Sequence, residues 1–300
     1  MQRRTLVLLL LGIMALGMVF PVMAATQSTQ PNRASQVEGE VIRVGTDAAY
    51  PPFEEIDEDG EYVGFDIDLM EAIAEDAGFE IEWVNAPFDT IFTALSEGEF
   101  DAVISASTIT EEREEIIDFS DPYFVSSQSI SVGLDMEEMV AGPEDLEGLR
   151  IGVQLGTTGE IYANEELEGV EIFPFDTAPL AFQALAEGEV DAVIVDTPTT
   201  EEILATNPEL EAVVVGDPLT EEFYGIAVNE DYPELLEAIN ISLANLIEDG
   251  TYAEIFEDWF DVQPSEDFRP MDEEDMEDED MDDEDMEDME DMEATEEPAS

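Results

Sequence analysis

Apolar residues recur with two different periods between residues 41 and 262, and the change of period predicts strands that alternate with helices. From 66 to 77 the apolar positions are three and four residues apart, which predicts a helix, and Gly78 follows as its C-cap. A second stretch with the same spacing, from 232 to 250, predicts a longer helix.

Two further helix starts and one turn can be predicted from short motifs. Asp89 precedes apolar residues at helical spacing, so we expect it to cap a helix. Residues 108–111 (TITE) have the capping-box pattern, so we expect a helix there with Arg113 in its opening turns. The pair Asp59-Gly60 lies between two strand-like stretches and predicts a hairpin turn.

An internal repeat divides this region into two similar halves. Residues 94–104 read ALSEGEFDAVI, and residues 184–194 read ALAEGEVDAVI. A weaker pair precedes them in the same order, with IRVG at 42–45 and LRIG at 149–152. Each half therefore has a buried strand, a helix ended by glycine and a second buried strand, which is typical of parallel sheets with helical crossovers. We predict two α/β lobes, with a ligand at the carboxyl ends of their strands.

The loops after the predicted strands carry side chains suited to a zwitterion. Arg113, beside a helix N-terminus, could bind a carboxylate with two guanidinium donors, and Thr108 could add a third. Asp196 offers a carboxylate to an ammonium group, while Tyr50 and Phe88 offer apolar walls. The four loops expected to face one cleft are 45–54, 105–108, 154–159 and 195–198.

Each of these residues also has a purely structural interpretation. Arg113 lies among four glutamates and could form a surface ion pair of little energetic value. Asp196 could cap the helix that follows it. Spacing alone favours neither role for Arg113 or Asp196, and it favours the core for Tyr50 and Phe88.

The two ends of the chain differ in composition from the region between them. Two arginines precede an apolar run over 6–20, which is short for a membrane span and predicts a secretory signal over 1–25. An uncleaved anchor is the alternative, and the arginine pair also allows twin-arginine export. Residues 26–40 predict a flexible linker, and the acidic residues 263–300 predict a disordered tail to which we assign no function.

The composition excludes several kinds of chemistry. The chain has no Cys and no His, so it lacks a thiol nucleophile, the usual zinc ligands and the commonest general base. Seven basic residues, all Arg, oppose 80 acidic ones, and the net charge is −73. Such a chain has too few cations to bind nucleic acid, and we expect no metal or cofactor. Its self-repulsion predicts salt-dependent folding and a halophilic source.

Four segments occur in an order shared with a known family. They are DAAYPPFE at 47–54, GFDIDL at 64–69 with Ile73-Ala74, STITEER at 107–113 with DFSDPY at 118–123, and GTY at 250–252 with Trp259-Phe260. The segments resemble the bacterial extracellular solute-binding proteins for polar amino acids, family 3, over residues 41–262. The resemblance implies an α/β fold of the two-lobe periplasmic-binding-protein class (type II, Venus flytrap), with the ligand cleft between the lobes. Lobe 1 would comprise 41–125 and 224–262, and lobe 2 would comprise 126–223.

The resemblance also implies a role for each residue of the expected cleft. One group would hold the α-carboxylate of an amino acid, a second its α-ammonium group, and a third its side chain. The first group is Arg113 and Thr108 with the backbone of Ala106 and Thr158, the second is Asp196 with Ser105, and the third is Asp47, Tyr50, Phe88 and Gln154.

The function that the resemblance implies is capture of a free polar or basic amino acid for the membrane permease of an ABC transporter. The protein is expected to be a monomer that is secreted, periplasmic or associated with the cell surface, without enzymatic activity. An acidic ligand is disfavoured because Arg113 is the only cation expected in the cleft. The alternative is a dehydratase of cyclic prephenate-like acids on the same fold, with Asp47 or Glu54 as general acid. Asp196 opposes this alternative because a carboxylate there suits an ammonium group.

Overall fold

The computed structural model describes residues 37–265 and residue 268. The predicted signal at 1–25 lies outside the described residues, as do most of the predicted linker and most of the predicted tail. No helix within the described part of the chain is long and apolar enough to span a membrane.

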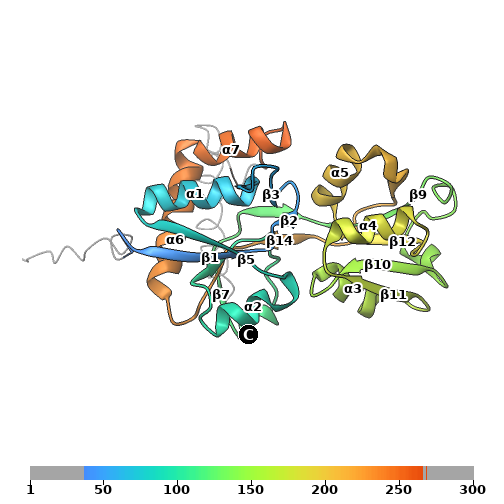
Figure 1. Cartoon of the computed structure of the whole chain (residues 1–300), viewed down its shortest axis with the longest axis horizontal. Helices are drawn as coiled ribbons and strands as arrows, with labels where there is room; N and C mark the ends of the chain where they lie inside the picture. Colours follow the sequence, from blue (N-terminus) through green and yellow to red (C-terminus); the bar gives the residue numbers. More distant parts are fainter. Residues whose placement is uncertain (1–36, 266–267, 269–300) are drawn as a thin grey trace, which may run out of the picture. The chain divides into compact units, whose positions relative to one another are not determined.

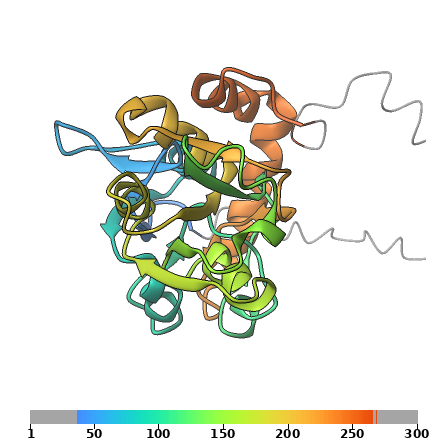
Figure 2. The same cartoon turned by 90° about the vertical axis from the view of Figure 1, so that its right-hand side faces the viewer.

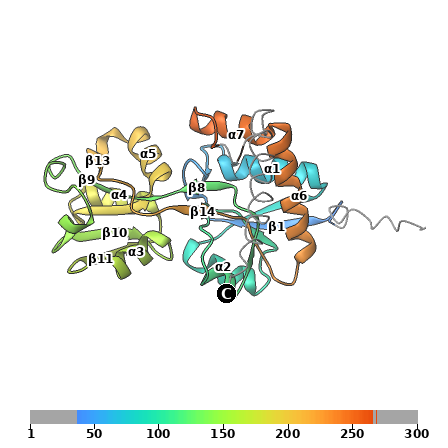
Figure 3. The ribbon, with the colours of Figure 1, turned by 180° about the vertical axis from the view of Figure 1, so that it is seen from behind.

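The first of two five-stranded sheets combines parallel and antiparallel strands. Its order is β5-β1-β6-β15-β7, in which β5 and β6 pair parallel to β1, while β15 pairs antiparallel to β6 and β7. We call this sheet and its helices the first lobe; α1 and α2 lie on opposite faces of the sheet (Figures 1 and 3). Its elements are β1 (Val41–Thr46), α1 (Phe65–Ala77), β5 (Glu80–Asn85), α2 (Phe88–Ser96), β6 (Ala102–Val103), β7 (Asp118–Phe119), β15 (Ala227–Val228), α6 (Pro233–Asp249) and α7 (Thr251–Phe260).

The second sheet has the same plan. Its order is β11-β10-β12-β9-β13, with β11 and β12 parallel to β10, and with β9 antiparallel to β12 and β13. We call it and its helices the second lobe, which faces the viewer in Figure 2. Its elements are β9 (Gln128–Gly133), η3 (Pro143–Leu146), β10 (Arg150–Gln154), α3 (Thr158–Glu166), β11 (Glu171–Phe175), α4 (Ala178–Ala186), β12 (Ala192–Asp196), α5 (Thr197–Thr206), η4 (Pro208–Leu210) and β13 (Ala212–Val215).

Two antiparallel strands carry the chain between the lobes. β8 (Phe124–Ser126) leads from β7 to β9, and β14 (Glu222–Tyr224) leads from β13 back to β15. They lie side by side between the two sheets (Figures 1 and 3). A small three-stranded sheet of β2 (Ala49–Tyr50), β3 (Glu54–Ile56) and β4 (Tyr62–Val63) belongs to the first lobe.

The internal repeat gives both lobes the same ion pair. Arg43 on β1 pairs with Asp101 at 3.2 Å, and Arg150 on β10 pairs with Asp191 at 2.6 Å. Each arginine also donates to a backbone carbonyl of the turn that precedes its aspartate. The repeated residues therefore tie β1 and β10 to the starts of the neighbouring strands β6 and β12.

Aromatic side chains fill the core of the first lobe next to the crossing strands. Phe53 and Phe65 are fully buried and pack edge-on against Phe124 of β8. This core extends beyond the predicted lobe, because Val37 and Phe268 also belong to it. Other rings in this cluster are Tyr123, Tyr224, Tyr252, Phe256 and Phe260.

Three local predictions agree with the structure. The helix predicted from 66 is α1, and Gly78 ends it in the left-handed conformation at φ 82°. The longer helix is α6, which Gly250 ends at φ 89°. The predicted hairpin joins β3 to β4, with Gly60 at φ 88°.

Other local predictions are wrong. α2 begins at Phe88, so Asp89 lies in its first turn, where a carboxylate favours the helix dipole, and does not cap it. No α-helix begins at 108–111, since the chain there pairs with β14, and only the 3-10 turn η2 (Arg113–Glu115) follows. The sheets are not purely parallel, because β15 in the first sheet and β9 in the second run antiparallel to both of their neighbours. Residues 37–40 are not a free linker, since Val37 is fully buried.

Candidate functional site

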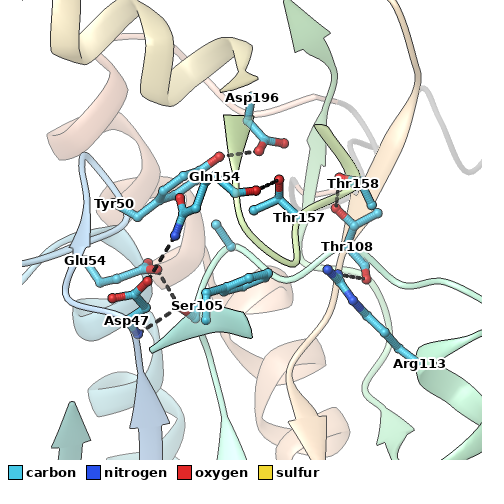
Figure 4. Close-up of a pocket in the computed structure, with 12 residues that line it drawn as sticks. Asp47, Tyr50, Glu54, Ser105, Thr108, Arg113, Gln154, Thr157, Thr158 and Asp196 are labelled. Carbon is cyan, nitrogen blue, oxygen red and sulfur yellow. Dashed lines mark hydrogen bonds between the residues drawn. The ribbon is translucent and has the colours of Figure 1, made fainter. Parts of the chain in front are cut away.

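All ten predicted site residues line one small cavity. The side chains come from both lobes and converge on a common space (Figure 4). The ten are Asp47, Tyr50, Phe88, Ser105, Ala106, Thr108, Arg113, Gln154, Thr158 and Asp196, and Glu54 and Thr157 complete the lining.

The strand ends position most of these residues, as the repeat predicts. Asp47 follows β1, and Ser105 to Thr108 follow β6 in the first lobe. Gln154 is the last residue of β10, and Asp196 is the last residue of β12. Because parallel strands present their carboxyl ends at one edge of a sheet, each lobe brings two loops to the same cavity.

Hydrogen bonds join the lobes across the cavity. Gln154 Nε2 donates to Asp47 Oδ2 at 3.0 Å, and the Tyr50 hydroxyl donates to Asp196 (Figure 4). Arg113 Nη2 donates to the carbonyl of Gly156 at 3.2 Å. The cavity is therefore enclosed by groups that belong to two separate sheets.

Arg113 is a buried cation, and the surface ion-pair interpretation is wrong. The residue is 8% exposed, and its guanidinium lies 4.5 Å from the ring centroid of Phe92 and 5.3 Å from that of Phe88. Nη1 donates to the Thr108 carbonyl at 2.7 Å. The ion pairs among described residues are those of Arg43 and Arg150, so Arg113 faces no described carboxylate within 4 Å. Burial lowers its pKa to about 10, which leaves it charged at neutral pH.

Asp196 is a buried acceptor. Its carboxylate accepts from the hydroxyls of Tyr50 and Tyr224 and from Gln128 Nε2, the last two at 2.7 and 3.1 Å. It makes no side-chain capping bond to α5, so helix capping does not explain it. Burial, with the charge of Glu222, raises its pKa to about 6. The group is therefore mostly ionised at neutral pH and suited to an ammonium ligand.

Asp47 is a second carboxylate at the opposite side of the cavity. Its N–H donates to Ser105 Oγ at 3.0 Å, which fixes the backbone after β1. Burial raises the pKa of its side chain to about 6, while hydrogen bonds from Phe88 N–H and Gln154 oppose that rise. Asp47 is therefore suited to hold the polar or cationic end of a side chain.

A layer of buried acids supports the cavity from below. Asp66, the second residue of α1, accepts the Ala106 N–H at 2.7 Å and the Tyr123 hydroxyl at 2.9 Å. Ala106 has the unusual φ of 42°, and the bond to Asp66 holds it there. Its N–H is thus already donated, so it is not a donor for a ligand carboxylate in this structure. Glu54 accepts from Ser105 Oγ at 2.7 Å.

Burial also controls the protonation of these two acids. Burial raises the pKa of Asp66 to about 7. Burial and the charge of Asp66 together raise the pKa of Glu54 well above its usual range. The raised pKa values favour the protonated forms of both acids, which reduces the negative charge beside the cavity.

The sequence predictions missed four residues at or beside the cavity. Thr157 could have been found, because it begins a capping-box pattern with Glu160 and accepts the Glu160 N–H at 3.3 Å. Asp66 lies within the GFDIDL segment, but that segment does not indicate its contact with Ala106. Gln128 and Glu222 lie on strands near the lobe crossing, where no local sequence pattern marks them.

Comparisons with known proteins agree with this geometry. The family model of the bacterial extracellular solute-binding proteins, family 3, matches residues 42–262. The ABC transporter arginine-binding protein 1 of Escherichia coli strain K12 is 38% identical over 224 residues, which cover 74% of this chain and 91% of that protein.

Two solved structures confirm the two-lobe α/β fold. An ancestral arginine-binding protein bound to arginine is 44% identical, has a TM-score of 0.72, and aligns over 75% of this chain and 99% of its own. An ancestral amino acid-binding protein described as a precursor of cyclohexadienyl dehydratase is 42% identical, with a TM-score of 0.68, over 73% of this chain and 95% of its own. The chain belongs to the bacterial extracellular solute-binding proteins, family 3.

Proposed function

We propose that this protein binds a free amino acid with a polar or basic side chain and delivers it to the permease of an ABC importer. The observation that carries the proposal is the pair of opposite charges in one buried cavity. Arg113 offers a guanidinium to the α-carboxylate, and Asp196 offers a carboxylate to the α-ammonium group. A ligand that satisfies both must carry both charges, so simple acids and simple amines are expected to bind poorly.

The remaining charges favour a basic side chain. Among the described residues, Arg113 is the only cation that lines the cavity, whereas Asp47 and Asp196 are two acids that are mostly ionised at neutral pH. A side-chain carboxylate on the ligand would face Asp47 without a cation. A guanidinium or ammonium group would instead pair with Asp47, and relatives named for arginine support this assignment.

Delivery requires movement of the lobes about the crossing strands. The bonds that join Asp47 to Gln154 and Arg113 to Gly156 can form only while the lobes are together. A ligand that contacts both lobes favours this arrangement by its differential affinity. We propose that β8 and β14 form the hinge, that the lobes divide near the residues predicted from the sequence, and that a monomer acts outside the cytoplasm.

One observation favours the dehydratase alternative enough to test it. Glu54 lines the cavity, and burial raises its pKa well above the usual range, which suits a general acid. Asp196 opposes it, because that carboxylate would repel an anionic substrate. We expect no turnover of prephenate-like acids, and product formation by the wild type that is lost in Glu54→Gln would reverse this assignment.

Thermal unfolding in molar salt tests the binding function. A ligand at 100 times its dissociation constant stabilises a protein by about 2.7 kcal/mol, so one or a few amino acids should raise the Tm clearly. Arg113→Ala should abolish the shift. Arg150→Ala is the matched control, since it removes the same charge from an ion pair outside the cavity and should keep the shift. No shift with any free amino acid would contradict the proposal.

A further inference from the structure

A carboxylate of the protein itself lies where two hydroxyls of the cavity converge. Glu222, on the crossing strand β14, is 5% exposed. Its Oε2 accepts the hydroxyls of Thr108 and Thr158, each at 2.7 Å. Thr108 belongs to the first lobe and Thr158 to the second, so this one oxygen bridges the lobes.

These bonds use the only proton that each hydroxyl has. A threonine hydroxyl donates one hydrogen bond, although it can accept two. Thr158 already accepts from Gln128 Nε2 at 3.1 Å, and its own proton goes to Glu222. While Glu222 is the acceptor, neither hydroxyl can donate to a second carboxylate.

Glu222 therefore presents inside the protein the same group that the ligand presents. The proposed amino acid would bring its α-carboxylate to Arg113 and Thr108, and Thr158 lies within 3.5 Å of Thr108 (Figure 4). Glu222 keeps two donors if the threonines turn away, since Thr220 donates to Oε1 at 2.9 Å and Gln128 lies 3.5 Å from Oε2. When the two threonine hydroxyls turn from Glu222 to the ligand, both the ligand carboxylate and the Glu222 carboxylate therefore still accept hydrogen bonds.

We propose that Glu222 competes with the α-carboxylate of the ligand for the hydroxyls of Thr108 and Thr158, and so limits the affinity of the cavity. This inference rests on the proposed function, because the competitor must be a ligand carboxylate. It makes Glu222 a residue that sets affinity although it lies outside the cavity lining. A moderate affinity allows release, which delivery to a permease requires.

Isothermal titration with L-arginine in molar salt tests the competition. Glu222→Gln removes the competing charge and keeps the shape, so it should bind L-arginine about tenfold more tightly than the wild type. Glu221→Gln is the matched control, because it removes the same charge from an exposed neighbour and should change the dissociation constant less than about twofold. Agmatine, which is arginine without its carboxylate, should gain no affinity from Glu222→Gln.

A double-mutant cycle separates competition from a general change in charge. In the Thr108→Val background one contested hydroxyl is gone, so the gain from Glu222→Gln should shrink. If Glu222→Gln does not fold, Glu222→Asp draws the carboxylate back by one methylene and should also tighten binding. If folded Glu222→Gln binds L-arginine as tightly as the wild type or more weakly, the inference about Glu222 is wrong, while the proposed function still holds. If no protein, wild type included, binds any amino acid, the proposed function fails and the inference fails with it.

Discussion

Asp47 and Asp196, two of the acids that line the cavity, are both buried. Asp47 and Asp196 lose most of their hydration, and burial is the main reason why the pKa of each rises to about 6. Each can bind a cation only when ionised. The charge state of the site therefore changes between pH 5 and pH 7.5, where Arg113 stays protonated.

This condition predicts pH-dependent binding. At pH 5 both carboxyls are mostly protonated, and at pH 7.5 both are ionised, so affinity should rise with pH. We expect L-arginine to bind at least about tenfold more weakly at pH 5 than at pH 7.5, since each pKa unit corresponds to a tenfold change. Titration calorimetry at constant salt measures the dissociation constant at each pH. The Asp47→Asn variant should show a weaker dependence of this constant on pH. A constant affinity across this range would contradict the role of both acids.

The acids below the cavity predict a second pH effect, on folding. The folded-state pKa values of Asp66 and Glu54 are raised, so the stability they contribute is complete below their unfolded values and is lost as pH rises through about 7 for Asp66. Through Asp66 alone, the free energy of unfolding should fall by roughly 2 kcal/mol from pH 5 to pH 7, and Glu54 should add to this fall. Urea unfolding at fixed molar salt measures it. Glu54→Gln should reduce the change in the free energy of unfolding with pH. Glu55→Gln, at an exposed neighbouring residue, should leave this change as it is in the wild type.

At the scale of elements, the approach of the β10–α3 loop to α2 depends on one glycine. Gly156 has φ 79°, and a Cβ there would lie 2.8 Å from the Cα of Asp89 in the other lobe. This atom belongs to the backbone of Asp89, which cannot move aside as the end of a flexible side chain can. The contact is therefore available only to glycine, and only while the lobes are together.

Gly156→Ala should consequently separate the lobes and weaken amino-acid binding by at least about tenfold, at the cost of about 1 kcal/mol in backbone strain. Gly98→Ala is the control, because Gly98 has the same φ of 79° with no atom within 4 Å of its would-be Cβ. It should lose similar stability without losing affinity. Equal affinities of the two variants for L-arginine, measured by calorimetry, would show that this contact does not govern binding.

The repeated segments explain why the paired strands were predictable. A Cβ on Gly45 would meet Phe100, and one on Gly152 would meet Val190, at 3.0 and 3.2 Å. Phe100 and Val190 occupy matching positions of the repeat, so each glycine makes room for the residue that packs on it. The local sequence pattern and the tertiary packing favour the same strands and the same glycine-ended helices. The sequence could therefore predict these elements correctly.

At the scale of the whole molecule, the main feature is a large excess of negative charge. The chain has 80 acidic residues and seven arginines, and among the described residues only Arg43 and Arg150 form ion pairs within 4 Å. Most acidic side chains therefore repel one another without a counter-charge. Salt screens this repulsion over about 10 Å at 0.1 M and about 3 Å at 1 M.

We therefore expect the Tm to rise steeply between 0.1 and 2 M NaCl. Screening of like charges is the reason, so sucrose at equal osmolality should raise the Tm much less. Circular dichroism at constant pH measures both series. A folded protein with the same Tm at low and high salt would contradict the prediction.

The residues predicted from sequence lie together in the structure and their roles toward a ligand stay predictions, whereas several supporting residues were missed. Strand ends and family segments located all ten predicted residues at one cavity. The turn at Arg113 was predicted as a helix, because the capping-box pattern does not show that β14 pairs with Thr108. Glu222 was missed for the same reason, since its partners come from both lobes.

The sequence by itself determined the elements, the two-lobe plan and the family, because helix caps, glycine turns and repeated strands depend on neighbours close along the chain. Only the tertiary structure decided which polar groups lose water and which donors they find. Tyr50 and Asp196 are 146 positions apart, and Thr108 and Glu222 are 114 apart. Their hydrogen bonds exist because two sheets approach across two crossing strands, and burial at that approach raises the pKa of Asp47 and Asp196.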